Sequence, residues 1–172
     1  GALYSSGDLT IDKCTFTNNT ARTGSGVIRL GMNSAFITNS LFEDNYCSIR
    51  GRAIELSGSA FKNISNCVFI NNRGLNGNIS DAVYMDTSYA GAAVADNNWW
   101  GTNDNPFTAK LTNINVTSWI VLSISADDNV VTAGLYKSRD VNGMEVVIDT
   151  SALPVRTISF APEDIMDPSV AD

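Results

Sequence analysis

The chain has 172 residues, a formal net charge of −7 and 44% apolar residues, a composition typical of a folded domain and not of a disordered chain. The acidity argues against a nucleic-acid partner, because phosphate backbones attract clusters of Lys and Arg. No apolar run approaches the roughly 18 residues of a membrane-spanning helix, so we expect no membrane span. Asn, Ser and Thr are abundant, and they favour turns because their side chains compete for backbone hydrogen bonds.

A short pattern recurs along the first two thirds of the sequence. The aromatic residues of its four copies are Phe16, Phe42, Phe69 and Trp100. One apolar run before each of them contains Leu3, Ile28, Ile54 and Val83, and another contains Ile11, Ile37, Ile64 and Val94. Three strand-like runs per repeat, separated by Gly, Ser and Asn, predict a parallel β-helix, because stacked coils about 4.8 Å apart bury continuous apolar columns.

The repeat also predicts which side chains stack from coil to coil. We expect the aromatic residues to form one column, and Asn side chains at a turn to form a hydrogen-bonded ladder, as in other stacked strands. The predicted ladder contains Asn19, Asn45, Asn72 and Asn103. A predicted slot for small residues contains Ala21, Cys47 and Gly74.

The three cysteines, Cys14, Cys47 and Cys67, are an odd number that does not make a disulfide framework. Cys14 and Cys67 occupy equivalent positions two coils apart, which is too far for a disulfide. We expect three buried free thiols that pack as small apolar side chains. The absence of His argues against a zinc site and leaves no imidazole to activate a catalytic Cys.

The pattern changes at Trp119, where the acidic excess also begins. Strand-like runs follow at residues 119–124, 130–136, 144–148 and 155–160. We therefore predict an all-β chain in two parts. Residues 1–118 form a right-handed parallel β-helix of about four coils, and residues 119–172 form a partial Ig-like β-sandwich segment.

Half a sandwich leaves strand edges unpaired. We therefore expect residues 119–172 to pack against the β-helix, to pair with another copy or to swap strands. The alternative fold is a β-sandwich, which also has many short strands and polar turns but does not need register-matched repeats.

An Asn-Trp-Trp-Gly motif ends the last predicted coil, at residues 98–101. It resembles the motif that closes the β-helix of adhesin-like surface proteins of methanogenic archaea. The strand that begins at Trp119 and the run at residues 153–160 are similar to strands of the Ig-like domains in that family. The resemblance implies an archaeal protein of the extracellular cell surface.

The same resemblance implies a role in attachment, in which the chain mediates or supports contact with glycans or surface proteins of other cells. It implies no cofactor. Since the stacked coils have open sheet edges, we also expect self-association.

Trp99 is the candidate ligand-binding residue. Period-2 alternation turns it outward if Trp100 faces the core, at the end of an outward column that contains Thr15, Leu41, Val68 and Trp99. Exposed apolar columns often mark interfaces, so Trp99 would stack on a sugar or another partner. The alternative is that the neighbouring Ig-like segment covers this column.

Two kinds of polar site remain. The oxygen-rich run of Asn103, Asp104 and Asn105 is a weak calcium candidate, with a polar turn as the alternative. Four sequons make Asn18, Asn63, Asn78 and Asn115 glycosylation candidates. Asn78 and Asn115 are the better candidates because we predict them in loops.

The alternative function is that of a polysaccharide-active β-helix enzyme, a lyase or a hydrolase. Glycoside hydrolysis needs two carboxylates at a defined separation. Asp12 and Asp96 fall at similar repeat positions, but three coils place them about 14 Å apart. Arg50 and Arg52 lie near Glu55 in the sequence, which indicates a solvated ion pair. We therefore expect no catalytic activity.

Overall fold

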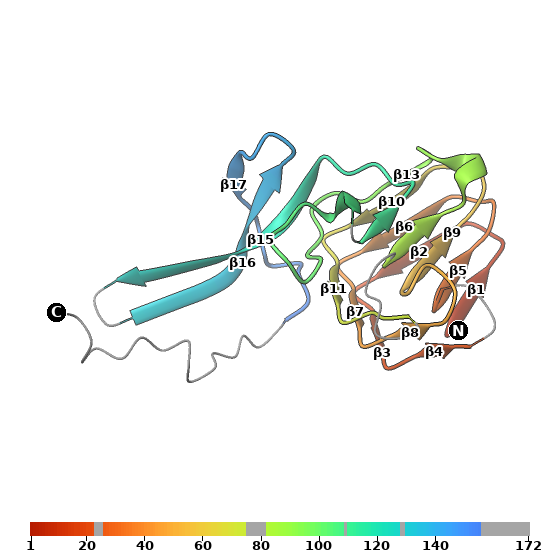
Figure 1. Ribbon diagram of the computed structural model, residues 1–172, viewed down its shortest axis with the longest axis horizontal. Helices are drawn as coiled ribbons and strands as arrows, with labels where there is room; N and C mark the ends of the chain where they lie inside the picture. The colour runs from red at the N-terminus through yellow and green to blue at the C-terminus, as the bar shows by residue number, and fades with distance from the viewer. Residues whose placement is uncertain (23–25, 75–81, 109, 128–129, 156–172) are drawn as a thin grey trace.

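The computed structural model describes residues 1–22, 26–74, 82–108, 110–127 and 130–155. The chain is nearly all-β, with a parallel β-solenoid of about four turns followed by an antiparallel sheet (Figure 1). The strands of the first part pair in parallel from coil to coil, so the β-sandwich alternative is wrong for this part of the chain.

Each of the first two coils has three strands of three or four residues and a fourth of two residues. The first coil consists of β1 (Leu3–Ser5), β2 (Leu9–Asp12), β3 (Thr15–Thr17) and β4 (Thr20–Ala21). The second consists of β5 (Ile28–Leu30), β6 (Ala35–Thr38), β7 (Leu41–Glu43) and β8 (Tyr46–Cys47). The third contains β9 (Ile54–Leu56), β10 (Lys62–Ser65) and β11 (Val68–Ile70).

The later elements are less regular. They are β12 (Val83–Met85), the 3-10 helix η2 (Thr87–Tyr89), β13 (Ala93–Val94), the 3-10 helix η3 (Pro106–Thr108) and β14 (Leu111–Thr112). The chain then forms the long strands β15 (Ser118–Asp127) and β16 (Val130–Asp140) and the short β17 (Glu145–Val147). The fourth strand-like run predicted from the sequence, residues 155–160, lies outside the described residues except for Val155.

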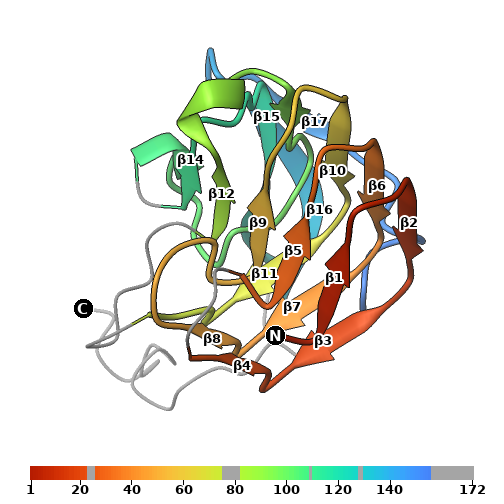
Figure 2. The same ribbon diagram turned by 90° about the vertical axis from the view of Figure 1, so that its right-hand side faces the viewer.

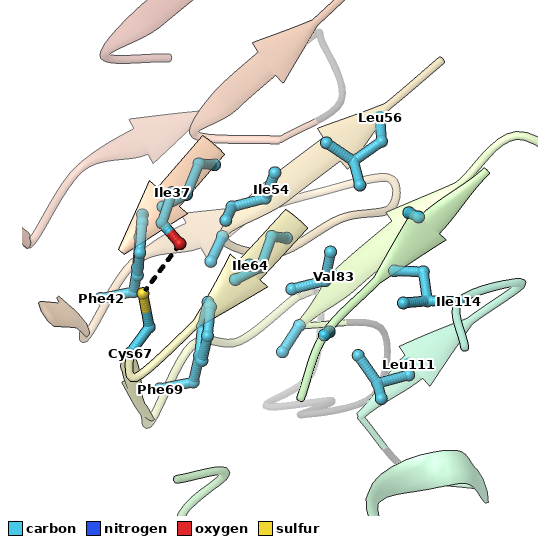
Figure 3. Close-up of a cluster of buried hydrophobic side chains, with 14 of the residues drawn as sticks. Ile37, Phe42, Ile54, Leu56, Ile64, Cys67, Phe69, Val83, Leu111 and Ile114 are labelled. Carbon is cyan, nitrogen blue, oxygen red and sulfur yellow. Dashed lines mark hydrogen bonds between the residues drawn. The ribbon is translucent and has the colours of Figure 1, made fainter. Parts of the chain in front are cut away.

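Strands at the same position in successive coils form the faces of the solenoid (Figure 2). The sheet orders are β1-β5-β9-β12-β14, β2-β6-β10-β13, β3-β7-β11 and β4-β8. The register confirms the first predicted apolar column, which pairs Leu3 with Ile28, Ile28 with Ile54 and Ile54 with Val83. Figure 3 shows Ile54 and Val83 in the core between the sheets.

The aromatic column is confirmed. Centroids of successive rings lie 5.1, 4.8 and 4.5 Å apart from Phe16 through Phe42 and Phe69 to Trp100, and neighbouring ring planes are within 11° of parallel. The column follows from the strand register, which pairs Phe16 with Phe42 and Phe42 with Phe69. Stacked aromatic pairs stabilise beyond the apolar area that they bury.

Left-handed backbone recurs at two turns of the coils. One turn has positive φ, between 52° and 55°, at Lys13, Asn39, Asn66 and Asn97. The other has positive φ, between 52° and 57°, at Asn18, Asp44 and Asn71. Apart from Gly, Asn and Asp tolerate this conformation best, because their short polar side chains bond locally. The repeated turns therefore account for much of the Asn in the sequence.

The Asn ladder is confirmed over three of its four predicted members. The backbone N and side-chain Nδ2 of Asn19 donate to Oδ1 of Asn45, at 3.0 and 3.1 Å. Asn45 repeats both bonds to Oδ1 of Asn72, at 3.3 and 2.8 Å. The prediction for Asn103 is wrong, because its amide bonds instead to the backbone of Leu122.

Another predicted column needs one correction. Ile11, Ile37 and Ile64 share a register, as expected. Val94, however, pairs with Asn63 on the outer side of its sheet, and the neighbouring Ala95 is the buried residue. In the fourth coil, the buried residue of this column was therefore predicted one position too early.

The strand β15 belongs to both parts of the chain. Its Trp119 bridges Asn98 in parallel, and Trp119 and Val121 lie in the solenoid core. From Ser118 to Asp127 the same strand pairs with β16 in an antiparallel ribbon. The predicted boundary at residue 118 therefore does not separate two cores.

The hairpin packs against the solenoid, which was one of the three arrangements expected for residues 119–172. Its apolar contacts form a second buried cluster, in which Ile120 meets Val68 and Trp99. Partly buried side chains around it come from Leu41, Ile70, Leu122, Leu135, Ile148 and Leu153. The distal half of the β15–β16 ribbon projects beyond this contact (Figure 1).

We expect Phe42→Ala to lower the free energy of unfolding by about 3–5 kcal/mol, because it removes a fully buried ring between two stacked neighbours. Phe36 lies on the outer side of β6 and is exposed, so Phe36→Ala is the matched control and should cost about 1 kcal/mol or less. Urea denaturation followed by circular dichroism measures both values. Equal losses in the two variants would contradict the role of the ring column.

Candidate functional site

Trp99 is not an open platform for a ligand. It extends the outward column, bridging Val68 in parallel as the register predicts. Its side chain is only 9% exposed, because Ile120 and the apolar residues of the hairpin cover it. The exposed Trp99 on which the ligand-binding prediction relied is therefore not observed, and the alternative, packing against the neighbouring segment, describes the structure.

The calcium candidates serve the turn that follows the last aromatic residue of the column. Asn103 accepts a hydrogen bond from Leu122 N and donates one to its carbonyl, while Asp104 accepts from the Thr102 hydroxyl at 3.0 Å. Asn105 Oδ1 accepts from the N–H of Phe107 at the start of η3. Within the described ranges, no group of three or more His, Cys, Asp or Glu side chains is placed to hold a metal ion.

The sequons occupy different environments. Asn18 and Asn115 are exposed, and Asn63 is half-buried on β10. Asn115 does not lie in a free loop, since it bridges Val94. Asn78 lies outside the described residues.

Asp12 and Asp96 each accept hydrogen bonds from a neighbouring coil. Asp12 accepts bonds of 2.7 Å from both Thr38 and Asn39, and these bonds hold the pKa of Asp12 below its ordinary value. Asp96 accepts from Thr117 and Ser118 of the following turn. Each carboxylate thus ties its own coil to the next.

The thiols of Cys47 and Cys67 are fully buried, as expected. Cys14 is exposed, so that part of the prediction is wrong. It occupies the same turn as Ser40 and Cys67, but the first described coil has a neighbour on one side only. Burial raises the pKa of the Cys67 thiol to about 12, and Figure 3 shows this thiol against the carbonyl of Ile37.

Lys62 is a basic residue inside the solenoid that sequence reasoning missed. Its side chain is fully buried, and Nζ donates to the carbonyls of Gly58 and Ala60, at 3.2 and 2.9 Å. No carboxylate within the described ranges pairs with it. Burial lowers the pKa of Lys62, because a buried charge loses its hydration.

A charged cluster lies on the outer side of the sheet β1-β5-β9-β12-β14. The register places Tyr4, Arg29, Glu55 and Tyr84 in one column, one residue per coil. Glu55 lies between two guanidinium groups, with Nε of Arg29 and Nε of Arg50 each 3.4 Å from one of its carboxylate oxygens. We call these five residues, Tyr4, Arg29, Arg50, Glu55 and Tyr84, the arginine column.

The ion pair predicted near Glu55 forms with Arg50, but its carboxylate is not solvated and Arg52 takes no part in it. Glu55 is buried beneath the two arginines that pair with it. Arg50 extends over Tyr84, with its guanidinium carbon 4.6 Å from the ring centroid and its Nη1 2.9 Å from the hydroxyl. Such a stack combines a cation–π contact with a hydrogen bond.

Arg52 is buried next to the arginine column. Its Nη1 donates to the carbonyls of Cys47 and Ile49, at 2.8 and 2.6 Å. The guanidinium occupies the place where a side chain at Gly74 would stand, since a Cβ there would lie 2.3 Å from the Arg52 carbon Cζ. The small-residue slot that holds Ala21, Cys47 and Gly74 therefore makes room for a cation.

Sequence reasoning missed the arginine column because it compared neighbours in the chain. Arg29 and Glu55 are 26 positions apart but lie on adjacent strands. The signal was present in the repeat for four of the five residues of the arginine column. Tyr4, Arg29, Glu55 and Tyr84 each sit one position after a residue of the predicted apolar column of Leu3, Ile28, Ile54 and Val83.

Thiol labelling should distinguish the three cysteines. We expect the native chain to react with one equivalent of a thiol reagent at pH 8, at Cys14, because the other two thiols are fully buried. The variant Cys14→Ser should show no fast reaction, and denaturant should expose every remaining thiol. Fast labelling of Cys67 in the folded chain would contradict this placement.

The stability of the chain should rise with pH through the titration of Lys62. Its folded pKa is lowered, so between that pKa and the unfolded value of about 10.4 the unfolded state binds more protons. Folding is therefore favoured as the pH rises through this window. Urea denaturation from pH 7 to 10.5 measures the free energy of unfolding of the native chain and of Lys62→Met. The value for the native chain should increase relative to that of Lys62→Met as the pH rises. A pH-independent difference would contradict the lowered pKa.

In the part of the chain that the structure describes, no helix has the length and apolar character needed to cross a membrane. Comparison with protein-family models, curated proteins and solved structures found no match.

Proposed function

We propose that this chain is a stalk module of an adhesin-like cell-surface protein, in which the solenoid supports attachment to other cells or glycans. The observation that carries the proposal is the set of columns that run from coil to coil. The aromatic column, the apolar columns and the Asn ladder all run along the same axis. A solenoid whose coils contact mainly their neighbours extends in one direction and forms a rod.

The hairpin supports the same function by continuing the rod. Trp119 Nε1 donates to the carbonyl of Asn103 at 3.1 Å, and the Ser138 hydroxyl donates to Asn97 Oδ1 at 2.7 Å. These bonds and the cluster around Trp99 fix β15 and β16 to the last coil. We propose that the three-stranded antiparallel sheet is the first part of an Ig-like domain of the methanogen adhesin type.

The alternative of a polysaccharide-active enzyme receives less support. Asp12 and Asp96, the carboxylates considered for hydrolysis, are occupied by hydrogen bonds that link coils. Glu55 is buried between two arginines and is not paired with a second carboxylate within the described residues. A glycosidase of the usual kind needs two carboxyl groups across the scissile bond.

Labelling of intact cells tests the surface location. Antibodies raised against the purified chain should bind intact cells that produce it, and mild protease treatment of those cells should remove the signal. A cytoplasmic protein of the same cells is the control, since it should be labelled only after permeabilisation. Labelling that requires permeabilisation would overturn the proposal.

A cleavage assay separates the stalk from the enzyme. Incubation of the purified chain with a panel of neutral and acidic polysaccharides should produce no new reducing ends and no unsaturated sugars. Products that accumulate in proportion to the chain would support the enzyme and overturn the stalk.

A further inference from the structure

We propose that the arginine column binds an acidic polysaccharide built from uronic acids. Arg29 and Arg50 would hold sugar carboxylates, and Tyr4 would stack against a sugar ring. This inference goes beyond the stalk function, because it assigns a binding surface to one face of the rod.

The first argument is the local charge. The chain is acidic as a whole, yet two arginines, Arg29 and Arg50, flank a single carboxylate, that of Glu55. Arg22 and Arg73 are exposed at the adjoining corner, where Arg73 bridges Tyr46 of β8. Among these described residues, positive charges outnumber negative ones. Arg is the side chain that best matches a carboxylate, because its planar fork donates two parallel bonds.

The second argument is accessibility. The side chains of Arg29 and Arg50 are 56% and 42% exposed, although each contacts Glu55. Tyr4 is 69% exposed at the end of the same column, next to Arg29 on the adjacent strand. A sugar ring can pack its apolar face against an exposed aromatic ring. The acid group of the same sugar can then pair with a neighbouring cation.

The third argument is unsatisfied polar atoms. Oε2 of Glu55 and Nε of Arg50 are buried, and although each belongs to an ion pair at 3.4 Å, neither makes a hydrogen bond of normal geometry with another described residue. Nε of Arg52 is in the same state. Buried polar atoms without partners are rare in folded proteins. Exposed Arg side chains change rotamer within nanoseconds, so a movement of Arg29 would open Glu55 Oε2 to a sugar hydroxyl, which is a donor.

The same features favour a sugar acid over nucleic acid. A phosphate backbone carries closely spaced charges and is held by broad basic surfaces. The arginine column is narrow, contains a carboxylate and belongs to an acidic chain. In a polymer of sugar acids, the separated carboxylates would pair with the two exposed arginines, and the hydroxyl groups would donate to Glu55. Since neighbouring strands are about 4.8 Å apart, a polymer along the solenoid axis would meet one side chain per coil.

Isothermal titration calorimetry with the full chain tests the proposal. Oligogalacturonate is the probe, its fully methyl-esterified form is the neutral counterpart, and single-stranded DNA is the polyanion counterpart. We expect binding of oligogalacturonate that weakens with added salt, and no binding of the other two. Equal binding of DNA, or no binding of oligogalacturonate, would overturn the proposal and leave the stalk function standing.

Variants test the residues. Arg29→Gln and Arg50→Gln should each weaken binding about tenfold or more, because each removes a charge-assisted pair of bonds. Tyr4→Ala should weaken binding, and Tyr4→Phe should preserve it. Arg139→Gln is the matched control, since Arg139 pairs with Glu145 on the hairpin and should not affect binding.

Circular dichroism establishes that each variant is folded. If Arg29→Gln does not fold, Arg29→Lys keeps the charge next to Glu55 and should still weaken binding, because Lys lacks the planar fork. Binding that is unchanged in Arg29→Lys and Arg50→Gln would overturn the proposal.

Discussion

The structure depends on vertical register, which is the requirement that each coil repeat the position of the coil below it. The Asn ladder shows why the requirement is strict. In each of its two steps, the side-chain oxygen of one Asn accepts hydrogen bonds from the backbone N–H and the side-chain amide of the Asn in the preceding coil. The Nδ2 group of the accepting Asn also donates to a Phe carbonyl of that preceding coil. A shift of one residue would leave these buried groups without partners, and each unpaired group costs about 1–3 kcal/mol. The same shift would move the stacked rings to the outer side of the sheet.

Register is also what made the fold predictable from the sequence. The first three coils repeat at nearly constant spacing, so the partners of Phe42, Ile54 and Asn45 followed from counting residues. The interval between the third and fourth coils is longer, and the same count then failed at Val94 and Asn103. Asn103 leaves the ladder because its turn is used to fix Leu122 of the hairpin. Exposure of Cys14 was missed for a different reason, since position in a repeat does not reveal whether another coil covers it.

The charged groups were the least predictable part. Lys62 begins the strand β10 and appears in the sequence as an ordinary surface residue, yet it fills an inward position and donates to two backbone carbonyls. Arg52 is buried because Gly74 lacks a side chain, a relation between residues in different coils. Local charge patterns carry no information about such pairs. A column-by-column alignment of the repeats would have shown Arg29 beside Glu55, but not that Arg50 reaches over the sheet to Tyr84.

The placement of Trp99 links the solenoid to the hairpin. The outward column that begins at Thr15 and Leu41 becomes more apolar towards its end, where Val68, Trp99 and Ile120 are buried together. Ile120 belongs to β15, which starts as a rung of the solenoid and continues as a strand of the antiparallel ribbon. A ribbon that shares a strand with the last coil has little freedom to rotate about it, because rotation would break the bonds of Asn97 and Asn103 as well as the apolar contact. The hairpin therefore protects the apolar end of the column from solvent, while Arg29 and Arg50 of the arginine column remain largely exposed on the sheet β1-β5-β9-β12-β14.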